Sequence, residues 1–269
     1  MKIIAFDICG KMAHFRKYYA NNTALSYTIP PRTTLMGIVA AILGRERDSY
    51  YNDLSSNHLR IGVRALNPMK KTFHRLNLLR IESIGDLSRD NLGDFRGTGK
   101  LGGRIQTPFE VVSGHDLTTD FVRYRLYLAA NTEGVSLLNE IEKVLTNRQA
   151  VFNISLGVAN FSASLGQLLI DEDVTVYEPN NDFQVLHSAV PTSAIQLDSK
   201  DNGIMSLEEE LLPLDFTKNT YRELTGLSHF VFSTNGEPFK AKVNRPFFRF
   251  KSTNTEGVAI FENILFLEK

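Results

Sequence analysis

Hydrophobic and polar residues alternate in several short segments of the chain. Residues 2–9 place Ile4, Phe6 and Ile8 on one face, which is typical of a half-buried strand. The same alternation predicts strands at residues 59–66, 121–129 and 151–158. Each of these segments is long enough to cross one sheet.

Two other segments carry apolar residues at helical spacing. Residues 33–43 predict a helix in which Thr33 or Thr34 is the N-cap and Gly44 is the C-terminal stop. Residues 135–147 predict a second, amphipathic helix. Both helices follow a predicted strand.

The resulting order is strand, helix, strand, insertion, strand, helix, strand. This is the βαββαβ order of ferredoxin-like folds, and RRM-like (RNA-recognition) domains share it. In such a fold both helices cover one face of the sheet, and the other face is free. The residues predicted on the free face are Arg60, Arg64, Arg123, Arg125 and Tyr127. Arginine and tyrosine suit phosphate contact and base stacking, so we expect this face to bind RNA.

A long insertion separates the two central strands. Between residues 67 and 120 a two-residue turn would suffice, and yet about fifty residues intervene. Two strand-like segments, 72–83 and 104–113, flank a glycine-rich stretch, which predicts a protruding β-hairpin thumb over about residues 80–108. Its candidate RNA contacts are Arg80, Arg89, Arg96, Lys100, Arg104 and Gln106. The alternative is a flexible loop without a binding role.

The second half of the chain is predicted to be rich in short strands. We expect an RNA-binding domain over residues 1–160 and a small β-rich domain over residues 161–269. The acidic run at residues 208–210 is expected to form a helical turn. The acidic character of this half favours a docking surface for a protein partner.

Charge is divided unevenly between the halves. Residues 1–135 contain 19 Lys and Arg against 12 Asp and Glu, whereas residues 136–269 contain 11 against 18. This division favours a polyanionic partner for the first half, and a chance distribution of solvated charge is the alternative. Cys9 is the only cysteine, which excludes an internal disulfide and a cysteine-based zinc site. We therefore expect no metal or cofactor, and the lack of a signal sequence or membrane span favours the cytoplasm.

A basic and aromatic cluster surrounds the start of the first helix. It consists of Arg16, Lys17, Tyr18, Tyr19, Tyr27, Arg32, Thr33 and Thr34. Lysine and arginine contact phosphates, tyrosine stacks on bases, and a helix N-terminus attracts anions. The alternative for the tyrosines is that they pack the loop.

Two segments resemble a known family. Residues 13–44 (AHFRKYYANNTALSYTIPPRTTLMGIVAAILG) and residues 155–165 (SLGVANFSASL) resemble the fifth family of CRISPR-associated (Cas) proteins, within the RAMP superfamily. The Hmari-like variant of type I-B systems is the most similar subtype. Residues 190–194 add a weaker likeness in the second half.

The resemblance implies a non-catalytic subunit of a type I Cascade surveillance complex. Such a subunit binds the CRISPR RNA (crRNA) and caps its 5′ handle, and its thumb crosses the RNA. The implied protein partners are the backbone subunit of the Cas-seven family and the large subunit. Target DNA near the protospacer-adjacent motif is a further candidate partner.

Two other functions remain open. One subtype of the family contains a metal-independent endoribonuclease with a Tyr/Lys/His set, and His14 is the candidate here. This sequence has no Lys-His dipeptide, and His14, His74 and His115 are far apart along the chain, which disfavours catalysis. The segment GTGKLGG (97–103) lacks the spacing of a phosphate-binding loop. A stand-alone RNA-binding module is the third candidate.

Overall fold

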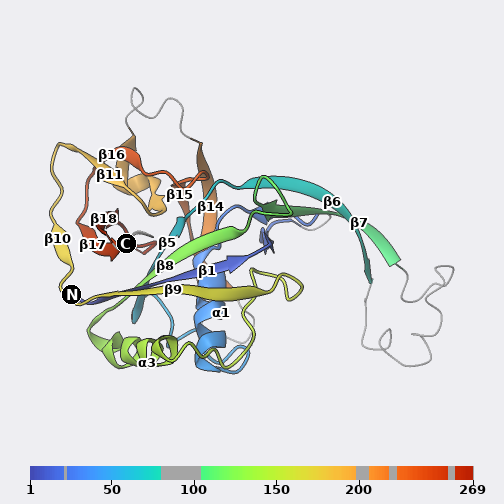
Figure 1. Cartoon of the computed structure of the whole chain (residues 1–269), viewed down its shortest axis with the longest axis horizontal. Coiled ribbons are helices and arrows are strands. Elements are labelled where there is room, and N and C mark those ends of the chain that lie inside the picture. Colours follow the sequence, from blue (N-terminus) through green and yellow to red (C-terminus); the bar gives the residue numbers. More distant parts are fainter. Residues whose placement is uncertain (21–22, 80–103, 198–205, 218–222, 254–257, 269) are drawn as a thin grey trace.

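The computed structural model is a mixed α/β structure rich in strands (Figure 1). It describes residues 1–20, 23–79, 104–197, 206–217, 223–253 and 258–268. The helical elements are α1 (Arg32–Leu43), η2 (Thr132–Gly134), α3 (Val135–Thr146) and η3 (Thr192–Ala194). The strands of the first half are β1 (Ile3–Gly10), β2 (Met12–Ala13), β3 (Phe15–Arg16), β4 (Ser26–Tyr27), β5 (Leu59–Ala65), β6 (Lys70–Leu79), β7 (Arg104–Ser113) and β8 (Val122–Ala130). Those of the second half are β9 (Ala163–Asp171), β10 (Thr175–Tyr177), β11 (Phe183–Leu186), β12 (Val190–Pro191), β13 (Ile195–Leu197), β14 (Leu207–Phe216), β15 (Leu224–Ser233), β16 (Phe239–Val243), β17 (Phe247–Thr253) and β18 (Ala259–Ile264).

A four-stranded antiparallel sheet forms the centre, in the order β5-β8-β1-β9. The predicted strands at 2–9, 59–66 and 121–129 are confirmed as β1, β5 and β8. The strand predicted at 151–158 is wrong, because residues 151–158 form a loop and β9 begins at Ala163. The alternation there reflects the loop residues Ile154 and Leu156, which are buried in the core. The sheet therefore continues past the domain boundary expected at residue 160.

Both predicted helices are present and cover one face of this sheet (Figure 1). Gly44 ends α1 with a left-handed φ of 71°, as its sequence position predicted. The N-cap prediction is wrong. The cap is Pro31, whose carbonyl accepts the N–H groups of Thr34 and Leu35. Pro31 has extended backbone geometry, so the first helical residue is Arg32.

The opposite face of the sheet is covered by the carboxy-terminal strands, so the prediction of a free face is wrong. Phe248 and Phe250 of β17 pack with Tyr127 of β8 in one buried cluster. Arg125 is 6% exposed and Tyr127 is fully buried. Burial of this apolar area against the second half outweighs the polar character of the two side chains. Neither residue is available to RNA.

Several buried polar groups of this covered face bond to one another. Glu262 of β18 accepts hydrogen bonds from Arg64 and Arg125, both over 2.9 Å, and from the Tyr127 hydroxyl. Arg125 also forms a two-pronged ion pair with Asp7, over 2.7 and 3.1 Å. Burial raises the pKa of the Tyr127 hydroxyl well above its ordinary value. A buried charge requires such a partner, and here the second half of the chain supplies it.

The second half is built from short strands, as predicted, but its core is continuous with that of the first. Leu212 of β14 and Phe230 of β15 belong to the same buried cluster as Leu35 of α1. The acidic run at 208–210 lies in β14 and pairs with β15, so the predicted helical turn is wrong. Alternate burial at Glu210 and Leu212 favours the strand.

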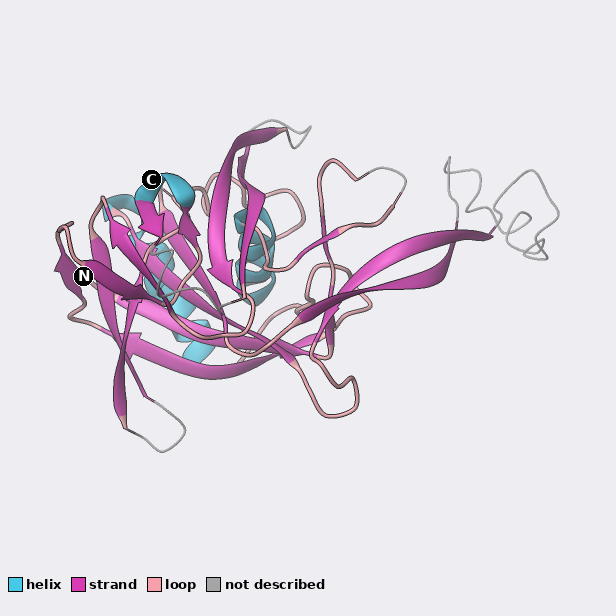
Figure 2. Ribbon diagram, turned by 90° about the horizontal axis from the view of Figure 1, so that it is seen from above, coloured by secondary structure: helices cyan, strands magenta, loops and turns pink. Residues whose placement is uncertain are grey.

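The predicted thumb begins as a long hairpin. Strands β6 and β7 pair without interruption from Lys70↔Ser113 to Leu79↔Arg104, and we call this ladder the thumb stem. The stem projects from the body of the molecule in both views (Figures 1 and 2). Arg80, Arg89, Arg96 and Lys100 lie outside the described residues. Among the helices that the structure describes, none is long and apolar enough to span a membrane.

Candidate nucleic-acid interface

The exposed part of the amino-terminal cluster is a short loop after β3. Arg16 is exposed and donates a hydrogen bond to the Ala20 carbonyl over 3.1 Å, which leaves the rest of its guanidinium for other partners. Tyr18 and Tyr19 are 45% and 52% exposed, and their rings meet edge to face at 5.2 Å. An arginine beside two solvent-facing aromatic rings matches the chemistry of single-stranded RNA binding.

Lys17 points the other way, into the protein. Its ammonium lies 3.0 Å from the Glu210 carboxylate and 5.4 Å from the centre of the Tyr27 ring. Burial lowers the pKa of Lys17, but the charge and hydrogen bond of Glu210 outweigh burial and the pKa is raised. Lys17 is therefore charged and already paired, and we remove it from the candidate phosphate contacts.

Tyr27 and Arg32 are also removed from the candidates, because both are buried. Tyr27 is 1% exposed, and burial raises the pKa of its hydroxyl. The Arg32 side chain is fully buried and bonds the carboxylates of Asp215 and Glu268. It also donates to the Leu54 and Leu59 carbonyls over 3.0 and 2.7 Å. The guanidinium of Arg32 therefore donates its hydrogen bonds to partners inside the molecule.

The start of α1 lies beside a cavity, and its use as a phosphate site stays a prediction. Thr33 and Thr34 are half-buried and line a cavity of about 400 Å³ together with Tyr50, Tyr51 and Phe216. None of the described residues that line this cavity is charged. Arg32, the first residue of the helix, is buried in the core.

The thumb stem presents a second exposed set of side chains. Phe73 is 60% exposed, and Arg75 and Gln106 are exposed. In the antiparallel register Phe73, Arg75 and Gln106 lie on one face of the hairpin. Phe73 and Arg75 were missed as candidates, although the alternation of residues 72–79 puts them on one face. Arg104 begins β7, and its backbone pairs with that of Leu79 at the outer end of the stem.

The two family-like segments meet at the base of the thumb stem. The N–H of His14 donates to the Leu156 carbonyl over 3.0 Å. Gly157 has a φ of 94°, and a Cβ atom there would lie 1.9 Å from the His14 carbonyl oxygen, so only glycine fits. This contact explains the Leu-Gly pair of the second segment.

His14 is a structural residue in this arrangement. It is 1% exposed, its Nδ1 lies 2.7 Å from the Glu110 carbonyl oxygen, and its ring is 4.0 Å from the Phe109 ring. Burial lowers the pKa of His14, which favours the neutral form. The fold does bring His74 near, since it lies opposite Phe109 in the stem. Burial nevertheless separates His14 from any bound phosphodiester.

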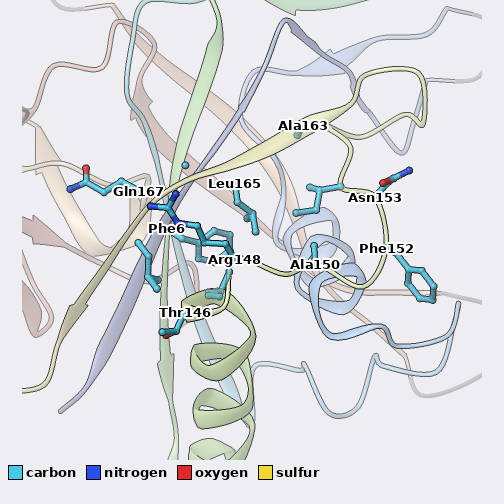
Figure 3. Close-up of a pocket in the computed structure, with 13 residues that line it drawn as sticks. Phe6, Thr146, Arg148, Ala150, Phe152, Asn153, Ala163, Leu165 and Gln167 are labelled. Atoms are coloured by element: carbon cyan, nitrogen blue, oxygen red, sulfur yellow. The ribbon is translucent and has the colours of Figure 1, made fainter.

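A larger cavity lies away from the thumb, between the end of α3 and β9 (Figure 3). It measures about 560 Å³ and has an apolar floor that includes Phe6, Leu165 and Leu168. Arg148 is the one charged residue among the described residues that line it. In Figure 3 the Phe152 side chain points away from the other labelled residues. Across the part of the chain that the structure describes, no group of three metal-ligating side chains is found.

A comparison with protein-family models decides the family. Residues 3–205 match the model of the family described as "CRISPR-associated protein (Cas_Cas5)". The chain belongs to this Cas5 family. The I-B subtype stays a prediction.

Solved structures are also similar to this Cas5 chain. A CRISPR protein from Archaeoglobus fulgidus is 15% identical with a TM-score of 0.56, over 97% of this chain and 99% of that one. A chain of a CRISPR RNA-guided surveillance complex is 14% identical with a TM-score of 0.43, over 88% and 91%. The first likeness supports the fold. A search of curated proteins gives no match.

Proposed function

We propose that this protein is a non-catalytic crRNA-binding subunit of a type I CRISPR Cascade complex that caps the 5′ handle. The observation that supports this role is the pairing of family membership with two exposed surfaces, the Arg16–Tyr18–Tyr19 loop and the Phe73–Arg75–Gln106 face of the thumb stem. Both surfaces combine a cation with at least one solvent-facing aromatic ring, a combination that binds single-stranded RNA.

The strand arrangement supports a ferredoxin-like central domain. With the four strands numbered in chain order, the sheet reads second, third, first, fourth, and all neighbouring pairs are antiparallel. Both helices lie on one face. RNA binding by the open sheet face does not follow here, because that face is covered, so the proposal assigns RNA binding to the loop and the thumb.

The proposed assembly includes the partners that the family resemblance implies. These are the backbone subunit of the Cas-seven family, the large subunit and target DNA near the protospacer-adjacent motif. The acidic exposed residues of the second half remain the proposed protein-docking surface. The thumb residues Arg80, Arg89, Arg96, Lys100 and Arg104 remain proposed phosphate contacts.

The test is the salt dependence of RNA binding. Log K of binding falls as log salt concentration rises. We expect Arg16→Ala to reduce the steepness of this fall by about 0.7, the value for one lost phosphate contact to a single strand. The matched control is Arg47→Ala, since the Arg47 side chain is 84% exposed and lies past the far end of α1. Titration of the repeat-derived 5′ RNA at several salt concentrations measures both. An unchanged slope in Arg16→Ala, or an equal loss in both variants, would contradict the proposed interface.

A further inference from the structure

The thumb stem is attached to the body on both of its strands. The outer contacts of β7 are made by the amino-terminal segment, where Met12 pairs with Ser113. Ala24 exchanges backbone hydrogen bonds with Pro108 and Glu110 over 3.0 and 2.9 Å. The Ser26 N–H donates to the Glu110 carboxylate over 2.7 Å. These contacts fix β7 largely through the backbone.

Strand β6 is attached differently, through charge and to the other half of the chain. The Lys71 ammonium lies 2.5 Å from a Glu208 carboxylate oxygen and 3.2 Å from one of Glu210. Beside it, the Met69 N–H donates to the Thr234 carbonyl over 2.9 Å. Glu208, Glu210 and Thr234 all belong to the β14–β15 hairpin or its end.

The two carboxylates are themselves held in place. Glu210 is 5% exposed and accepts the Thr28 N–H over 3.0 Å, in addition to Lys17. Glu208 accepts the Thr28 hydroxyl over 2.5 Å. Burial lowers the pKa of Lys71, but the charges of Glu210 and Glu208 outweigh it and the pKa is raised. Lys17, Lys71, Glu208 and Glu210 therefore form a quartet of paired side chains at the base of β6.

We propose that this quartet is a clamp through which the β14–β15 hairpin fixes the angle of the thumb stem, with Glu208 as a positioning residue for RNA binding. Glu208 touches no RNA in this scheme. It acts by holding Lys71, the first charged residue of the stem that is paired across to the second half. The inference rests on the proposed RNA-binding function, and it adds that the second half of the chain controls the RNA-gripping element.

The clamp predicts an effect on RNA affinity opposite to the one that simple electrostatics predicts for removal of the Glu208 carboxylate. Removal of a carboxylate near a polyanion ordinarily strengthens binding, because one repulsive charge is lost. If the clamp positions the thumb, removal of Glu208 lowers the fraction of molecules with the stem correctly placed. The apparent dissociation constant rises as the inverse of that fraction, so a fall of the fraction to about one fifth weakens binding about five-fold.

The chain supplies a matched control at the next residue. Glu209 lies on the opposite face of β14, is 55% exposed in its side chain and pairs with His229 rather than with the thumb. Glu208→Gln and Glu209→Gln therefore remove the same charge from neighbouring positions. We expect Glu208→Gln to weaken binding of the repeat-derived 5′ RNA about five-fold and Glu209→Gln to leave it unchanged or slightly stronger.

A second measurement reads the thumb without RNA. Spin labels are placed on the exposed residues Asn77 in β6 and Glu133 in the body, with Cys9→Ser as background. The distance distribution is expected to broaden in Glu208→Gln and to stay narrow in Glu209→Gln. Equal or tighter RNA binding by Glu208→Gln overturns the clamp, and so does weaker binding with an unchanged distribution. If the wild-type protein does not bind the RNA, the proposed function fails, while the distance distributions still decide the clamp.

Discussion

Residues that look alike in the sequence have opposite roles in the structure. Arg16, Lys17 and Arg32 lie in one basic segment, but only Arg16 is exposed. Lys17 and Arg32 pair with Glu210 and Glu268, which are about 190 and 240 residues away along the chain. No local pattern indicates such partners, and so sequence alone assigned all three to RNA.

Arg32 supports a prediction about stability. Arg32→Met leaves the half-buried carboxylate of Asp215 and the buried carboxylate of Glu268 without their cation, and removal of one member of a buried ion pair costs about 3–5 kcal/mol. We expect the free energy of unfolding to fall by that amount in urea titrations. Arg16→Ala is the control and should unfold like the wild type. A stable Arg32→Met protein with weakened RNA binding would restore Arg32 to the interface.

His187 supports a prediction about pH. Burial, reinforced by the nearby Arg64 charge, lowers the pKa of His187 from 6.5 to about 4, against the opposing charge of Glu262 and the backbone hydrogen bond with Asn263. As pH falls, His187 takes up a proton in the unfolded chain near pH 6.5 but in the folded protein only near pH 4. The contribution of neutral His187 to the free energy of unfolding is therefore complete above pH 6.5 and is lost as pH falls toward 4. The loss is at most about 3 kcal/mol. In His187→Gln the free energy of unfolding should depend less on pH between 6.5 and 4 than in the wild type. An identical pH dependence in both proteins would contradict the lowered pKa of His187.

At the scale of elements, alternation identified strands well but could not identify what covers them. The strands β1, β5 and β8 and both helices follow from periodicity, and the thumb stem follows from two strand-like segments around an insertion. The sequence also placed Arg125 and Tyr127 correctly on the side away from the helices. That this side is buried depends on β17 and β18, more than a hundred residues later. Long-range packing of this kind has no local signature.

The acidic run at residues 208–210 shows the same limit on a smaller scale. As a helical turn it would put its three carboxylates around one axis, whereas β14 divides them between two faces. Glu208 and Glu210 turn toward the thumb stem, and Glu209 turns toward His229. Strand pairing with β15 therefore decides which acidic residues can influence the thumb.

At the scale of the whole molecule, the uneven charge of the two halves has an internal explanation. Several cations of the basic first half pair with acidic residues of the second half. Among these pairs are Lys17 with Glu210, Lys71 with Glu208, Arg32 with Asp215 and Glu268, and Arg64 and Arg125 with Glu262. The excess charge of each half is thus partly used to join the halves, and only the remainder is available to a polyanion.

The last prediction concerns chemistry. A metal-free ribonuclease needs a general base and a general acid that converge on one phosphodiester. The fold brings both histidines beside Phe109, since the His14 ring contacts the Phe109 ring and His74 is the cross-strand partner of Phe109. His14 and His74 are therefore closer in space than their separation in the sequence indicated. His14 is nevertheless 1% exposed, its Nδ1 is occupied by the Glu110 carbonyl, and its lowered pKa leaves it neutral at pH 7. We therefore expect no site-specific product when the protein is incubated with a repeat-containing precursor RNA in EDTA and the RNA is resolved on a denaturing gel. A discrete cut within the repeat that disappears in His74→Ala, with Arg16→Ala as the binding-defective comparison, would establish the endoribonuclease in place of the non-catalytic subunit.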